Sequence, residues 1–178
     1  MFEKESGYRV QQREAVVETD LSTFIPETYL RSEEERLALY RKLYALSSPE
    51  QLLEVQEEMQ DRFGRFPEET RNLFGMVRLR LAAARIGFRK VTVKGNQLEA
   101  EFPPESDKDF YEREQFQSIM NLVSQTQKKT AQLRQVGNVL KLTVQLSGLQ
   151  GAEDNIAKSL NFLGQVQRND PTDRSEGF

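Results

Sequence analysis

Apolar residues in the first half of the chain recur at spacings of three and four, which is the pattern of helices that bury one face. The segment 31–46 carries Ser32 near its start and Glu35 three positions later. This spacing predicts a capping box at the start of a helix. The predicted buried face of this helix consists of Leu37, Tyr40, Leu43 and Tyr44.

Two more helices are predicted directly after the first. The segment 47–63 has Ser48 as its cap and Pro49 in its first turn. The segment 67–87 starts at Pro67 and ends at Gly87. Gly75 in its interior lowers helix stability by roughly 1 kcal/mol relative to alanine, and a glycine retained at this cost indicates close packing against another helix. The predicted buried residues are Leu52, Val55, Met59 and Phe63 in the second helix, and Leu73, Phe74, Val77, Leu81 and Ala84 in the third.

The second half of the chain changes to a period of two. Residues 91–102 alternate around one Gly-Asn pair and residues 131–146 around another, and each pair predicts a two-residue hairpin. A helix is predicted after each hairpin, over 110–125 and 151–166. The expected fold class is therefore α+β: an N-terminal three-helix segment followed by two β-hairpins and two helices. These elements are expected to form a four-stranded, mainly antiparallel sheet with the helices packed on one face.

The same pattern divides the chain into three parts. Residues 1–30 are expected to form an extended arm, with a short strand candidate at 15–21 and apolar residues that lie along another surface. Residues 31–165 are expected to form one compact domain. Residues 166–178 have no apolar stripe and are predicted to be a flexible tail.

A sharp corner is predicted between the second and third helices. Gly64 is expected to end the second helix in a left-handed conformation, which glycine adopts at little cost. Phe63 is expected to close the core beneath this turn, and Pro67 to preset the first turn of the third helix. Phe63, Gly64 and Pro67 together therefore form the predicted structural motif.

The residue inventory excludes several kinds of chemistry. The 178 residues include no His and no Cys, which excludes Ser-His and Cys-His nucleophiles and the usual zinc sites. No phosphate-binding loop sequence is present, so we expect no catalytic residue, no cofactor and no metal. Because the sequence has neither a membrane-spanning apolar run nor a signal peptide, we expect a cytoplasmic protein with no membrane partner.

Charge is unevenly distributed along this chain of formal net charge −3. Acids outnumber bases between residues 33 and 69, whereas 71–94 contains bases and no acid. Both segments can be solvated or paired internally, or one of them can meet a partner. A nucleic-acid-binding module that uses the basic 71–94 segment is one alternative function, and a small enzyme with paired carboxylates is another. The bases of this segment are Arg71, Arg78, Arg80, Arg85, Arg89, Lys90 and Lys94.

Glu58 and Asp61 lie three residues apart just before the corner and are expected to share a helix face. With these features in place, the sequence resembles the C-terminal domain of the bacterial transcription-repair coupling factor. The resemblance covers about residues 15–102. It is carried by Glu18–Leu30, Glu35–Leu43, Asp61–Gly64 with Pro67, Arg78–Arg80, and Ile86-Gly87 with Lys90.

The resemblance implies a non-catalytic, autoinhibitory domain of a DNA translocase that couples transcription to nucleotide excision repair. It implies that the domain docks on the UvrA-binding module of the same chain and masks it, with Glu58 and Asp61 as the docking carboxylates. It also implies an upstream translocase motor outside this sequence, and contacts with DNA, RNA polymerase and UvrA through the full-length protein.

Overall fold

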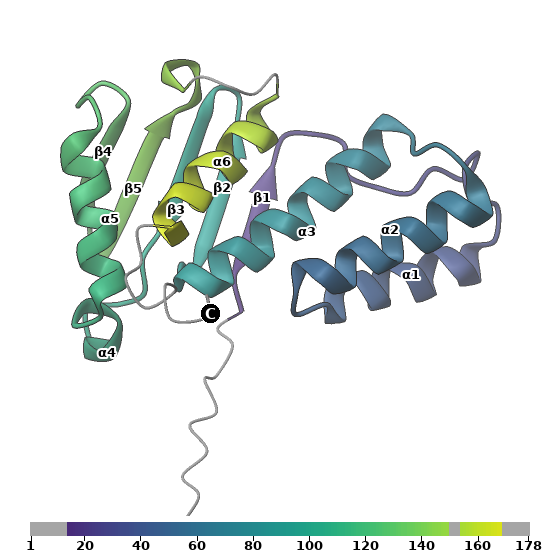
Figure 1. Ribbon diagram of the computed structural model, residues 1–178, viewed down its shortest axis with the longest axis horizontal. Helices are drawn as coiled ribbons and strands as arrows, with labels where there is room; N and C mark the ends of the chain where they lie inside the picture. The colour runs from purple at the N-terminus through teal and green to yellow at the C-terminus, as the bar shows by residue number, and fades with distance from the viewer. Residues whose placement is uncertain (1–13, 150–153, 169–178) are drawn as a thin grey trace, which may run out of the picture.

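A helical part and a sheet part make up the computed structural model, which describes residues 14–149 and 154–168 (Figure 1). Helices α1 (Glu33–Ala45) and α2 (Pro49–Phe63) lie side by side in the helical part. Helix α3 (Glu68–Ile86) runs from them to the sheet and joins the two parts. The three helices predicted from the apolar spacing are therefore confirmed.

The starts of α1 and α2 are capped as the sequence predicts, with one difference. Ser48 and Gln51 form a complete capping box at α2, because each side chain accepts a hydrogen bond from the other residue's backbone N–H. At α1 the Ser32 hydroxyl accepts from the Glu35 N–H at 3.2 Å, but the Glu35 carboxylate does not reach back. It accepts a hydrogen bond from Arg62 of α2 instead, because a charged donor is a stronger partner than a backbone N–H.

Both predicted hairpins are present in the sheet. The first joins β2 (Lys90–Lys94) to β3 (Gln97–Glu101), and the second joins β4 (Ala131–Val136) to β5 (Val139–Gln145). The β3 and β5 strands are antiparallel neighbours and connect the two hairpins.

The predicted four-stranded sheet is wrong, because the described residues form a sheet of five strands in the order β1-β2-β3-β5-β4. The additional strand, β1 (Val16–Thr19), pairs with β2 in parallel and makes the sheet mixed. The Val16 N–H donates to the Arg89 carbonyl, and the Glu18 carboxylate lies 2.8 Å from the Lys90 amine. Four residues carry too little alternation to reveal a partner strand some seventy positions further along the chain, so this pairing is a tertiary effect.

The predicted helix over 110–125 is two helices, α4 (Lys108–Tyr111) and α5 (Glu114–Gln125). The rings of Phe110 and Phe116 both contact Phe102, each with its centroid at 5.9 Å. In one continuous helix these two residues would point about 120° apart. The break at residues 112–113 therefore lets both rings enter the same core.

Helices α3, α5 and α6 (Asn155–Arg168) all lie on one face of the sheet (Figure 1). A short 3-10 turn, Leu146–Gly148, follows β5. The α6 helix includes residues 166–168 of the predicted tail and buries Val166, whereas residues 169–178 lie outside the described residues.

Two apolar clusters form the core, and α3 contributes to both. Its residues Leu79, Ala83 and Ile86 belong to the cluster under the sheet, whereas Phe74, Val77 and Leu81 belong to the helical cluster. The remaining members of the helical cluster come from α1, the loop after it and α2: Leu43, Leu46, Leu52, Val55 and Met59.

The predicted buried face of α1 is partly wrong. Leu43 is buried and Tyr40 is half-buried, but Leu37 and Tyr44 are 48% and 70% exposed. The face that contacts the core is displaced around the helix toward Leu39, which packs on the helical cluster. Spacings of three and four define a broad stripe, and only the packing of α1 against its neighbours selects which edge of that stripe is buried.

The segment before α1 lies along the helical part, as its apolar residues suggested. Ile25 and Leu30 are buried, and the Ile25 N–H donates to the Tyr40 hydroxyl at 2.7 Å. The Thr70 hydroxyl of α3 donates to the Phe24 carbonyl at 3.2 Å. These hydrogen bonds tie the chain between β1 and α1 to both neighbouring helices.

Gly75 lies where α3 meets α6, and the close packing that it indicated is confirmed. A Cβ atom placed on Gly75 would lie only 2.7 Å from Cγ2 of Ile156. Because Ile156 is β-branched and 6% exposed, its side chain has few alternative rotamers with which to make room.

Gly75→Ala is therefore expected to lower the free energy of unfolding by about 1–3 kcal/mol, as overpacking of a core contact does. The matched control is Gly164→Ala in α6, where the nearest atom to the new Cβ is the end of the Arg168 side chain, at 3.7 Å. That substitution is expected to raise the free energy of unfolding by about 0.5–1 kcal/mol, because alanine is the better helix former. Urea melts of the two variants should shift in opposite directions, and shifts in the same direction would contradict the close α3–α6 contact.

Candidate functional site

The corner between α2 and α3 turns at Gly64, which has an unusual backbone conformation. Gly64 has φ +81° and ψ −153°, so the predicted left-handed helical conformation is wrong. These angles lie in the mirror image of the extended region, which is essentially accessible only to glycine. The Gly64 N–H donates to the Gln60 carbonyl at 2.9 Å, and the Tyr29 hydroxyl donates to the Gly64 carbonyl at 3.0 Å.

Gly64→Val is expected to lower the free energy of unfolding by about 1–3 kcal/mol, because a β-branched residue is strained at this φ and ψ. No neighbouring atom lies within 4 Å of a Cβ at Gly64, so the whole effect comes from the backbone. The matched control is Arg65→Val at the next, exposed position, whose φ is negative. Equal denaturation midpoints for the two variants would show that the backbone at position 64 can move to a conformation that valine adopts without strain, which would contradict this expectation.

The other two residues of the predicted motif occupy the corner less deeply than expected. Phe63 is half-buried, with its ring centroid 6.0 Å from that of Tyr29 and the Arg62 guanidinium 4.7 Å above it. The prediction that Phe63 closes the core is therefore only partly correct. Pro67 is the residue just before α3, and its carbonyl accepts the first helical hydrogen bond from the Arg71 N–H at 3.0 Å.

Glu58 is held by bases of its own domain. Its carboxylate oxygens lie 2.7 Å from the Lys42 amine of α1 and 3.4 Å from the Arg62 guanidinium. Arg62 also contacts Glu35 at 2.9 Å, so the four side chains link α1 to α2. The hydrogen bond from Lys42 holds the pKa of the Glu58 carboxyl below its usual value, and Glu58 stays ionised in this network at neutral pH.

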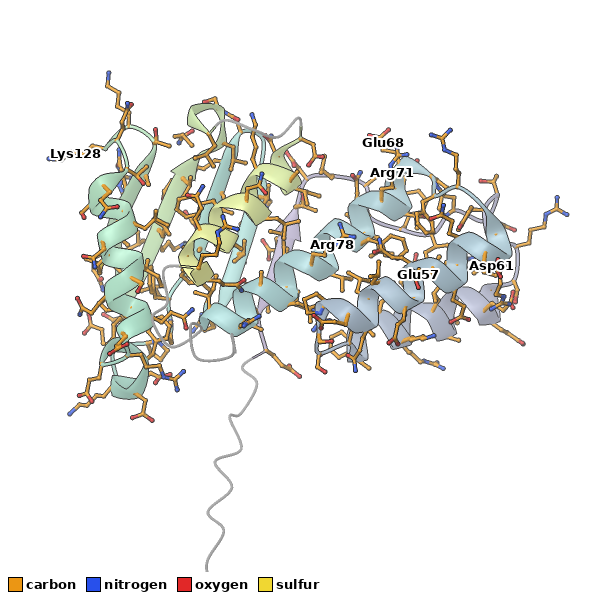
Figure 2. The ribbon with its side chains drawn as sticks, in the orientation of Figure 1. Glu57, Asp61, Glu68, Arg71, Arg78 and Lys128 are labelled. Carbon is orange, nitrogen blue, oxygen red and sulfur yellow. The ribbon has the colours of Figure 1, made fainter. Side chains whose placement is uncertain are left out.

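Asp61 differs from Glu58 because its carboxylate has no hydrogen bond or ion pair to the described residues. Glu57, one helical turn earlier, is exposed and equally unpaired within the same ranges. Residues four apart share a helix face, and Figure 2 labels both along α2. The free negative charge on the last two turns of α2 thus belongs to Glu57 and Asp61. The sequence did not reveal that Lys42, sixteen positions from Glu58, contacts it. Glu57 was also not predicted as a site residue, although its spacing of four from Asp61 was a usable signal.

Several bases of the 71–94 segment are engaged inside the domain. Arg80 donates to the Leu43 and Leu46 carbonyls at 3.1 and 3.0 Å, which satisfies the end of α1. The Arg78 guanidinium donates to Gln56 at 2.8 Å. Lys90 and Lys94 both contact Glu18 of β1, and Arg89 lies 3.8 Å from Glu101. These contacts support the interpretation of internal pairing over a continuous basic face for nucleic acid.

Neither a metal site nor a membrane-spanning helix is found in the part of the chain that the structure describes. No group of three acidic side chains within residues 14–149 and 154–168 could hold a metal ion. Within the same ranges, no helix combines the length and the apolar character needed to cross a bilayer.

The fold and the corner together define an α+β domain whose candidate site is a charged helix surface beside a rigid turn. The chain belongs to the TRCF domain family, whose model matches residues 19–113, more than half of the 178 residues. The resemblance inferred from the corner and the flanking helices is thereby confirmed.

Named relatives agree with this assignment. The chain is 29% identical over 106 residues to the transcription-repair-coupling factor of Staphylococcus epidermidis, a match that covers 60% of this chain and 9% of the relative. It is 31% identical over 75 residues to that of Bacillus subtilis, covering 42% of this chain and 6% of the relative. The chain therefore spans less than a tenth of the length of these relatives.

A solved structure has the same fold. The crystal structure of the C-terminal domain of a transcription-repair coupling factor superposes with a TM-score of 0.71 and 18% sequence identity. The match covers 90% of this chain and 96% of that domain. The fold thus corresponds to that of the C-terminal domain of a transcription-repair coupling factor, and the likeness extends across the sheet part as well as the helices.

Proposed function

We propose that this chain is a regulatory domain that docks on the UvrA-binding module of a transcription-repair coupling factor and masks it. The observation that carries the proposal is the pair of unpaired, exposed carboxylates of Glu57 and Asp61 at the end of α2, in a chain of the TRCF domain family. Glu58 lies on the same surface, but its negative charge is partly compensated by ion pairs with Lys42 and Arg62.

The corner supports docking because it fixes the part of α2 that carries these carboxylates before a partner arrives. Gly64 and Tyr29 hold the end of α2, and the contacts of Glu35 and Lys42 hold α2 against α1. A preordered surface loses little conformational entropy on binding, so more of the interaction energy appears as affinity. Arginines on the partner are the complementary chemistry, since guanidinium groups bind carboxylates with two parallel hydrogen bonds.

In the proposed mechanism the domain acts only by binding. It neither holds nor hydrolyses ATP, and release from the UvrA-binding module exposes the surface that UvrA recognises. The translocase motor, DNA and RNA polymerase enter through the full-length coupling factor, whose motor supplies the trigger for release. The proposed location is the cytoplasm, where the transcription and repair proteins of bacteria work.

Calorimetric titration of the chain into a purified UvrA-binding module tests the proposal. We expect saturable one-to-one binding that weakens as salt is raised, because the interface is charged. A parallel titration into duplex DNA is expected to give no saturable heat. Binding to DNA with a steep salt dependence, and none to the module, would support the alternative function as a nucleic-acid-binding module instead.

A further inference from the structure

The β4 strand forms one edge of the sheet, and no strand within residues 14–149 and 154–168 lies on its outer side (Figure 1). The Gln145 N–H donates to the Thr130 carbonyl at 2.7 Å, which sets the alternation of the β4–β5 ladder. Gln132 and Arg134 therefore direct their backbone groups toward β5, whereas Leu133 and Gln135 direct theirs away from it. Those outward N–H groups have no hydrogen-bond partner among the described residues.

Positive charge lies beside this free edge. Lys128 and Lys129 are exposed just before β4, Arg134 is exposed within it, and none pairs with a carboxylate in residues 14–149 and 154–168. Figure 2 shows Lys128 at the opposite end of the molecule from Asp61, so this basic region is separate from the corner.

A polar hollow of about 380 Å³ lies next to the edge, on the face of the sheet without helices. Lys129, Gln132 and Arg134 line it from the β4 side. Lys141, opposite Arg134 in the ladder, also lines it but is engaged by Glu99 at 2.7 Å and Glu101 at 3.0 Å. The positive charge available to a ligand at this hollow therefore comes from Lys129 and Arg134.

We propose that the β4 edge binds an extended peptide in which acidic and apolar residues alternate. The peptide backbone pairs with Leu133 and Gln135 and continues the sheet by one strand. Because successive side chains of a strand point to opposite faces, one set of peptide side chains lies over the hollow and the other lies on the helix side. Acidic residues in the first set meet Arg134 and Lys129, and apolar residues in the second meet the half-buried Leu133.

Charge and composition favour an acidic peptide at this edge over a second copy of the chain and over a nucleic acid. A second copy that paired antiparallel through Leu133 and Gln135 would place the two Arg134 side chains on one face, opposite each other or two positions apart, and they would repel. The residues that line the hollow include no aromatic side chain on which a nucleic-acid base could stack.

The test is fluorescence polarisation with a labelled eight-residue peptide that alternates valine and glutamate. We expect saturable binding of this peptide by the whole chain, and at least tenfold weaker binding of the same peptide with its two central residues replaced by proline. Leu133→Pro removes an outward N–H and no β4–β5 hydrogen bond, so it should weaken binding at least tenfold and retain the fold. The matched control is Arg113→Glu, an exposed charge change outside the β4 edge. It should leave affinity within twofold.

A charge exchange keeps the test decisive if Leu133→Pro is unstable. The Arg134→Glu variant should bind the valine–glutamate peptide at least tenfold more weakly than the unchanged chain does. It should bind a valine–lysine peptide at least tenfold more tightly. Unchanged preference in this variant, or equal binding of the proline-containing peptide, would overturn the proposal. Concentration-dependent dimers in sedimentation that disappear with Leu133→Pro, or tighter binding of oligothymidylate than of the peptide, would also overturn it.

Discussion

Phe102→Ala is expected to lower the free energy of unfolding by about 3–5 kcal/mol, the loss typical of a deleted core phenylalanine. Phe102 is 1% exposed and lies at the centre of an aromatic group, with the rings of Phe88, Phe110 and Phe116 at centroid distances of 5.1, 5.9 and 5.9 Å. Its N–H also donates to the Leu140 carbonyl, so the cavity would open where the two hairpins meet.

The matched control is Phe63→Ala at the corner, where the ring is only half-buried. Half of the apolar area gives about half of the transfer free energy, so a loss of about 1–2 kcal/mol is expected. Urea denaturation followed by circular dichroism gives both values. Equal losses would contradict the division between a central sheet core and a peripheral corner.

Reversal of both Glu58 and Asp61 to lysine is expected to weaken binding to the UvrA-binding module at least 100-fold, about 2.7 kcal/mol. Each reversal replaces attraction toward a partner arginine with repulsion. Asp61→Lys alone should account for most of the loss, because Asp61 has no partner in the described part of its own domain. Glu58→Lys also breaks the contact with Lys42, but both side chains are about half exposed to solvent, so the double variant should lose little stability.

The matched control changes the same amount of charge at another place. Asp109 and Glu112 are exposed at and just after α4, beside the sheet and away from α2 (Figure 1). Their reversal to lysine should leave affinity within about threefold, since only long-range screened charge is altered. Equal loss from both double reversals would indicate a general effect of net charge, and no loss from either would exclude Glu58 and Asp61 from the interface.

The sequence predicted those features whose causes are local. Ser32 and Ser48 cap helices, and Gly-Asn pairs turn both hairpins, because each depends on residues within a few positions. Gly64 was recognised as essential at the corner, although its ψ angle was not the one expected, since sequence indicates a positive φ but not ψ.

The features that escaped prediction depend on contacts between distant elements. The β1 strand joins the sheet through β2, and the exposure of Tyr44 follows from how α1 packs. The difference between Glu58 and Asp61 has the same origin. Their spacing is local, but Lys42 reaches Glu58 only after α1 and α2 have come together. A helix-face argument alone therefore treats as equal two carboxylates that the tertiary structure makes different.

Masking of the UvrA-binding module is most directly measured by competition. The module is immobilised, UvrA is supplied at a fixed concentration, and the amount of UvrA captured is followed as the chain is added. The proposed function predicts that capture falls to background as the chain saturates the module, and that the Asp61→Lys variant leaves capture nearly unchanged at the same concentrations. Undiminished capture of UvrA by a module that is already saturated with the chain would contradict it.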